Sequence, residues 1–110
     1  METMRVYQKW EDMTLYLYES LRSYPKSERF TLAAETIRAS IDVGASLARA
    51  NVVRDKWKWI ERADIELARL KILVRLGFKM EFLPIKKYEL LSGMLTEIGR
   101  MIGGWTKSSA

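Results

Sequence analysis

The sequence contains no cysteine and no histidine. Without cysteine the chain has no disulfide framework, no thiolate nucleophile and no cysteine ligand for zinc. Without histidine it also lacks the commonest general base and the commonest metal ligand. These two absences weigh heavily against an enzyme, so we expect neither catalysis nor a bound cofactor.

Long apolar runs are missing as well, and none approaches the roughly 18 residues that are needed to cross a membrane. The first residues, METMRVYQKWED, have no apolar signal core. We therefore expect no membrane contact and a cytoplasmic location. The 110 residues predict a single domain, 1–110, with a modest core. The 19 Lys and Arg against 14 Asp and Glu give a net charge of +5, which allows a nucleic acid or an acidic protein as partner without requiring one.

The stretch from Lys56 to Lys79 predicts one long helix with two apolar rows. The first row has alternating spacings of three and four, as expected for a core face: Ile60, Ala63, Leu67, Leu70, Val74 and Phe78. A second, narrower row lies on the opposite side: Ile65, Ile72 and Leu76. A helix of a plain bundle needs only one apolar face. We therefore interpret the second row as a contact with another subunit of a homo-oligomer.

Similar spacings predict three further helices. The first spans about Met4 to Ser23, with a buried row of Val6, Trp10, Met13, Leu17 and Leu21. The second begins at Pro25 or just after Ser27 and ends near Ala50. Its expected buried row is Phe30, Ala33, Ile37, Ile41, Gly44 or Ala45, and Ala48. Gly44 costs a helix about 1 kcal/mol against alanine, so we expect a neighbour to approach it closely.

The last helix is expected to begin at Pro84, with a buried row of Tyr88, Leu91, Leu95, Ile98, Ile102 and Trp105. Gly103 and Gly104 predict its end, followed by a mobile tail from Thr106 to Ala110. No segment has a strand pattern. The sequence therefore predicts an all-α fold, an antiparallel up-down-up-down four-helix bundle.

Cations flank the second apolar row of the long helix and form the candidate binding surface. These candidates are Arg54, Lys58, Arg62, Arg69, Arg75 and Lys79, with Arg38 and Arg49 as second choices. The alternative for each is a solvated or ion-paired cation, because Glu61, Asp64 and Glu66 lie on the same helix. Trp57 and Trp59 point in different directions, so one can enter the core. We favour packing over base stacking for this pair.

Two stretches resemble a known family. YPKSERFTLAAETIR, from Tyr24 to Arg38, is similar to the opening of the second helix in the bacterial four-helix-bundle family, which includes the ribosomal RNA intervening-sequence proteins. The stretch from Ala63 to Ser108, with its KKYE opening of the last helix and its EIGRMIGGW ending, resembles the accessory variability determinant (Avd) proteins of diversity-generating retroelements. The resemblance implies a non-enzymatic four-helix bundle that forms a basic, barrel-shaped homopentamer. It also implies that the protein binds the retroelement's reverse transcriptase and template RNA and so supports mutagenic cDNA synthesis.

Two other functions remain as alternatives. One is an oligomeric scaffold of the intervening-sequence type that does not bind nucleic acid, which two apolar faces fit equally well. The other is an enzyme with a carboxylate set drawn from Glu35, Glu61, Asp64 and Glu66. Di-metal bundles usually pair Glu-x-x-His motifs, and this chain has no histidine, so the enzyme is strongly disfavoured.

Overall fold

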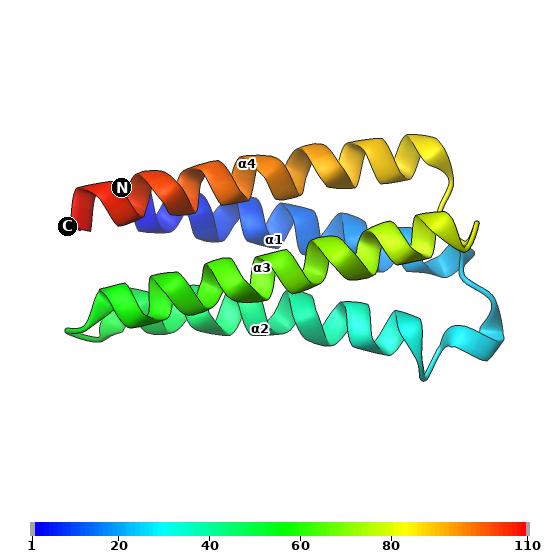
Figure 1. Ribbon diagram of the computed structural model, residues 1–110, viewed down its shortest axis with the longest axis horizontal. Helices are drawn as coiled ribbons and strands as arrows, with labels where there is room; N and C mark the ends of the chain where they lie inside the picture. The colour runs from blue at the N-terminus through cyan, green and yellow to red at the C-terminus, as the bar shows by residue number, and fades with distance from the viewer. Residues whose placement is uncertain (1, 110) are drawn as a thin grey trace.

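Four long helices packed side by side make up the computed structural model, which describes residues 2–109 and the side chains of residues 5–107 (Figure 1). They are α1 (Glu2–Ser20), α2 (Leu32–Val52), α3 (Lys56–Lys79) and α4 (Ile85–Ser109). Two 3₁₀ turns, η1 (Leu21–Ser23) and η2 (Lys26–Glu28), lie between α1 and α2. Consecutive helices run antiparallel and both ends of the chain lie at the same end of the molecule, so the predicted bundle topology is confirmed.

The predicted core faces of three helices are confirmed. Val6, Met13 and Leu17 of α1 are at most 1% exposed. The six predicted positions of α3 are all buried except Phe78, which is partly buried against the core. In α4 the row from Leu91 to Trp105 is buried, and Tyr88 packs at its edge. These faces meet because alternating spacings of three and four place apolar side chains on one side of a helix.

The predicted buried row of α2 is only partly correct: Ile37 is partly buried against the core, but other members of the row are exposed. Ala33 and Gly44 are buried, but Phe30 is 86% exposed, Ile41 is 50% exposed, and Ala45 and Ala48 are exposed. The face that enters the core is rotated by about one residue. It consists of small and hydroxyl residues with two larger side chains: Thr36, Ala39, Ser40, Val43, Leu47 and Ala50.

Hydrogen bonds explain why hydroxyl groups can line this part of the core. The Thr36 hydroxyl donates to the Leu32 carbonyl at 2.7 Å, and the Ser40 hydroxyl pairs with that of Thr14 at 2.8 Å. The indole N–H of Trp10 donates to the Ser40 carbonyl at 2.7 Å. A buried polar group costs little when it is paired in this way. The Trp10 ring lies directly over Gly44, so the predicted close neighbour of Gly44 is an indole.

Two helix boundaries also differ from the prediction. α2 begins at Leu32 rather than near Pro25, and Lys26–Glu28 forms a separate 3₁₀ turn. The Glu28 carboxylate accepts hydrogen bonds from the Thr31 hydroxyl at 2.8 Å and the Leu32 N–H at 3.4 Å, which supports the later start. α4 does not end at Gly103 and Gly104 but continues to Ser109, while Ala110 lies outside the described residues. The buried neighbours Ile102 and Trp105 keep this segment helical.

The connection between α1 and α2 is attached to the turn that follows α3. The Ser23 hydroxyl donates to the Phe82 carbonyl at 2.8 Å, and the rings of Tyr24 and Phe82 lie 5.5 Å apart. The turn itself closes α3 through a hydrogen bond from the Phe82 N–H to the Gly77 carbonyl, with Glu81 in the left-handed region at φ 66°. These contacts fix the position of the connection that carries η1 and η2.

Within residues 2–109, no helix is both long and apolar enough to span a membrane. The same part of the chain contains no group of three or more acidic side chains arranged to hold a metal ion.

Candidate functional site

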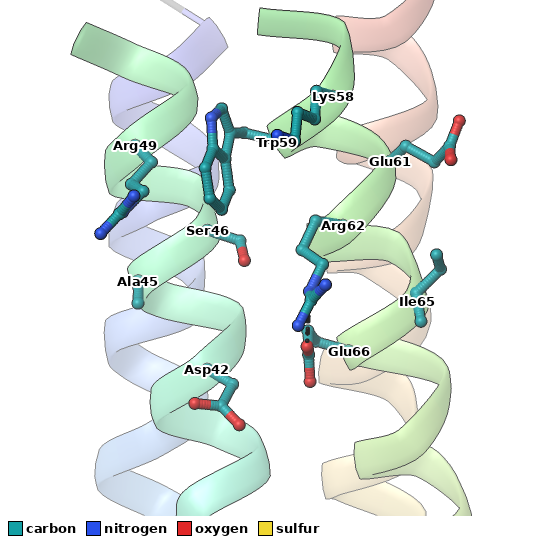
Figure 2. A pocket seen from close by; sticks show the side chains of 10 residues that line it. All are labelled: Asp42, Ala45, Ser46, Arg49, Lys58, Trp59, Glu61, Arg62, Ile65 and Glu66. Atoms are coloured by element: carbon teal, nitrogen blue, oxygen red, sulfur yellow. Dashed lines mark hydrogen bonds and ion pairs between the residues drawn. The ribbon is translucent and has the colours of Figure 1, made fainter. Parts of the chain in front are cut away.

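A groove of about 620 Å³ lies between the C-terminal half of α2 and the N-terminal half of α3 (Figure 2). Three of the predicted cations meet there: Arg49 from α2, and Lys58 and Arg62 from α3. Acidic side chains also line the groove, namely Asp42, Glu61 and Glu66. The lining is therefore balanced in charge, with Arg49, Lys58 and Glu61 toward one end and Asp42 and the ion pair of Arg62 with Glu66 toward the other.

Trp59 forms one wall of this groove, between two cations. The Arg49 guanidinium carbon lies 4.8 Å from the centroid of the indole, and the Lys58 ammonium lies 5.6 Å from it. Both distances are within the range of cation–π attraction. Trp59 is partly buried against the core, while Trp57 is 51% exposed, which confirms that the two tryptophans occupy different environments.

Arg69 is the centre of an ion-pair network that joins α2 to α3. Its guanidinium lies 3.0 Å from Asp42, 3.1 Å from Glu35 and 3.5 Å from Glu66. Partial desolvation lowers the pKa of Arg69, but hydrogen bonds to Asp42 and Glu35, together with the charges of Asp42 and Glu66, raise the pKa above its usual value. The network holds α2 and α3 together at the end of the groove where Asp42 and Glu66 lie.

The predicted cations differ in how free they are to bind an acidic ligand. Arg62 pairs with Glu66 at 3.0 Å, Arg38 pairs with Glu35, and Arg69 has the three partners above. The others make no ion pair with any side chain that the structure describes: Arg49, Arg54, Lys58, Arg75 and Lys79. From Lys58 to Lys79 the chain advances by roughly 32 Å along α3 at the usual rise per residue, and Arg54 lies before the helix begins. The eight cations therefore do not form one compact site.

The second apolar row of α3 is open to solvent in the monomer. Ile65 is 59% exposed, Ile72 is 68% exposed and Leu76 is 46% exposed. Ile65 also lines the groove beside Arg62. The row therefore runs next to the groove, and a subunit packed on it would lie close to the groove cations.

Comparison with protein families decides which family this bundle belongs to. The model of the bAvd-like family matches residues 4–109, nearly the whole chain. The chain belongs to the bAvd-like family. The resemblance to Avd proteins is thereby confirmed, and membership suggests an accessory role in a diversity-generating retroelement. Proteins of this family are generally non-catalytic accessory proteins.

A solved structure supports the fold of this bAvd-like chain. It is the crystal structure of a protein of unknown function from the S23 ribosomal protein family of Bacteroides thetaiotaomicron, with a TM-score of 0.87. The match covers 97% of this chain and 99% of that chain at 17% sequence identity, so it shows a shared fold. No curated protein sequence matches the chain.

The bAvd-like chain has a second basic hollow that the sequence did not predict. It is a pocket of about 390 Å³ at the other end of α2, between α1 and the connection to α2. Three cations line it: Arg22, Lys26 and Arg29. The three lie within eight residues of sequence, which was the available signal. In the sequence, residues 22–29 have the pattern of a helix break followed by the first turn of α2. Cations in such a segment are usually solvated, so the pattern does not indicate a binding site.

Proposed function

We propose that this protein is a non-catalytic accessory subunit of a diversity-generating retroelement. It binds the reverse transcriptase and the template RNA through the basic surface of α2 and α3, and so supports mutagenic cDNA synthesis. Membership of the bAvd-like family carries this proposal. The geometry is consistent with such a contact, because Arg49, Lys58 and Arg62 line one groove together with Trp59.

The proposed RNA contact is mainly electrostatic. Cations that neutralise phosphates release counterions, so the affinity falls steeply with salt and discriminates little between bases. The three groove cations can neutralise up to three phosphates, and for a single strand each phosphate adds about 0.7 to the slope of log affinity against log salt. The groove therefore contributes a slope of about −2 per subunit.

The proposal includes assembly into a homopentamer, which the family resemblance implies. The exposed row of Ile65, Ile72 and Leu76 is the proposed subunit interface. A charge of +5 per chain becomes a strong field when several copies surround one axis. The solution mass from light scattering at moderate salt tests this part, and a monomer would contradict it.

A triple variant tests the RNA-binding surface. Arg49→Ala, Lys58→Ala and Arg62→Ala together should weaken binding of single-stranded template RNA and reduce the salt slope by about 2, with an unchanged circular dichroism spectrum. The matched control removes three exposed cations of α4, through Lys86→Ala, Arg100→Ala and Lys107→Ala, and has the same net charge. Co-purification with the reverse transcriptase is measured for both variants.

One observation favours a different function. The groove is lined by as many acidic side chains as cations, which would also suit a protein partner. In that case the protein is an oligomeric scaffold that does not bind nucleic acid. Absence of RNA binding would support the scaffold, whereas RNA binding that is equally strong in the triple variant and the wild type would contradict the assigned surface.

A further inference from the structure

The pocket at the N-terminal end of α2 has three cations and no acidic side chain in its described lining. The cations are Arg22, Lys26 and Arg29. None of the three cations forms an ion pair with a side chain within residues 5–107. This differs from the α2–α3 groove, where three carboxylates offset three cations. Like charges brought together without partners favour binding of an anion.

The two carboxylates nearest in sequence offset this charge only in part, because they are two against three cations. Glu28 is occupied at the start of α2, where it accepts from the Thr31 hydroxyl and the Leu32 N–H. Glu19 lies beside Arg22 in a neighbouring hollow, and its side chain is exposed to solvent. The charge balance around the pocket thus remains positive.

The N-terminus of α2 adds to the attraction for an anion. Ala33, the second residue of this 21-residue helix, lines the pocket. The N–H groups of a first helical turn have no carbonyl partner within the helix, and the helix dipole is positive at this end. The Glu28 carboxylate, which accepts from the Leu32 N–H, offsets part of this dipole, so the three cations are the main source of positive potential at the pocket.

The rest of the lining is apolar or aromatic. Leu21, Ala33 and Ile37 form part of the wall, and Tyr18 is 47% exposed at its edge. Tyr24 also lines the pocket and is held in place by its contact with Phe82. A volume of about 390 Å³ falls in the range of small-ligand sites. The lining suits a flat, mostly apolar group attached to an anion.

We propose that this pocket binds one nucleotide of a single-stranded nucleic acid. The phosphate contacts Arg22, Lys26 and Arg29, and the base stacks on the ring of Tyr18. Base stacking on an aromatic side chain needs an unpaired base, so a duplex is excluded from the pocket. The identification of the strand as template RNA rests on the proposed function, whereas the charge and shape of the pocket do not.

The experiment measures the affinity of a short single-stranded RNA by fluorescence anisotropy. Tyr18→Ala should weaken binding by about 5- to 100-fold, the usual effect of removing a stacking partner. Tyr7→Ala, which changes another partly exposed tyrosine of α1, should leave the affinity within about 2-fold of the wild type. Duplex RNA of the same sequence should bind Tyr18→Ala and wild type equally well.

A triple variant, Arg22→Ala with Lys26→Ala and Arg29→Ala, tests the phosphate contact. All three side chains are exposed, so the fold is expected to survive, and circular dichroism checks it. The salt slope for single-stranded RNA should fall by about 0.7, the contribution of the one phosphate that the three cations neutralise together. The α4 variant with Lys86, Arg100 and Lys107 replaced has the same net charge and should keep the wild-type slope. RNAs with and without a 5′-phosphate distinguish a terminal phosphate, which only the first supplies, from a backbone phosphate.

The outcomes separate this inference from the proposed function. If Tyr18→Ala binds as the wild type does, or if the α4 variant loses as much affinity as the pocket variant, the pocket assignment is overturned. If the protein still associates with the reverse transcriptase in that case, the proposed function survives. Loss of RNA binding in the pocket variant but not in the groove variant would support the pocket and contradict the groove as the RNA surface.

Discussion

Gly44 is the position where a single methyl group should be most informative about the packing of this bundle. The Cβ of an alanine there would collide with the six-membered ring of Trp10, and the Cη2 atom of that ring would be only 2.7 Å away. Trp10 has little freedom to withdraw, because its indole N–H is bonded to the Ser40 carbonyl on the same face of α2.

The expected effect of Gly44→Ala is the sum of three terms. Overpacking a core costs about 1–3 kcal/mol. Displacing the indole weakens one hydrogen bond, worth about 1 kcal/mol. Replacing a mid-helix glycine with alanine stabilises the helix by about 1 kcal/mol, which offsets part of this loss. We therefore expect a net loss of roughly 1–3 kcal/mol, and the melting temperature of a domain of this size should fall by at least about 4 °C.

Gly103→Ala is the matched control, because Gly103 is also a helical glycine. No atom lies within 4 Å of the position that its Cβ would occupy. Only the helix propensity changes, so we expect a gain of about 0.5–1 kcal/mol. Both variants are measured by thermal and urea unfolding at one protein concentration, since assembly would make the transition concentration-dependent. A stabilised Gly44→Ala variant would refute the argument that Trp10 fills this site rigidly.

Two further predictions concern ionisable groups. Burial raises the pKa of Tyr24 from 10.0 to about 12. The folded state therefore disfavours tyrosinate, so this contribution to stability is complete below pH 10 and is lost as the pH rises to 12; it amounts to about 2–3 kcal/mol. Urea unfolding should show this extra loss in the wild type and not in Tyr24→Phe. Arg69→Met leaves Asp42 without its cation, while Glu35 keeps Arg38 and Glu66 keeps Arg62, and we expect a loss of about 1 kcal/mol because the network is partly exposed. The loss should shrink at high salt and when Asp42→Asn is added, and an unchanged value in both tests would show that the ion pairs contribute nothing.

The sequence predicted α3 well because its core positions are all apolar or alanine and its pattern is unbroken from Lys56 to Lys79. The buried face of α2 was predicted only in part, for a physical reason. Ile37 and Ile41 suggest one face, but the core takes Thr36 and Ser40, one residue earlier in each case. The choice depends on Trp10, which needs small residues opposite it and bonds to the Ser40 carbonyl. A contact between two helices is not contained in the periodicity of either one.

The same limit applies to the candidate site. The positions of the cations on α3 followed from spacing, but which of them are neutralised did not. Arg69 pairs with Glu35 and Asp42, which are 34 and 27 residues away in sequence and lie on another helix. The spacing in the sequence indicates only the pairs within one helix, namely Arg62 with Glu66 at i,i+4, and Arg69 with Glu66 and Arg38 with Glu35 at i,i+3. Long-range ion pairs therefore decide which cations stay available to a ligand.

The pocket at the start of α2 shows how a helix boundary alters a functional interpretation. If α2 began at Pro25, Lys26 and Arg29 would lie on one solvated face of the helix. Two cations three residues apart are common on such a face and do not indicate a binding site. Because α2 begins at Leu32 and η2 is a separate turn, these two side chains instead line a pocket together with Arg22 and Tyr18 of the preceding segment. Glu28 supports this boundary, because its carboxylate accepts hydrogen bonds from the Thr31 hydroxyl and the Leu32 N–H at the start of α2. It keeps its negative charge there, so the pocket stays positive because three cations outnumber the two carboxylates near them in sequence, Glu19 and Glu28.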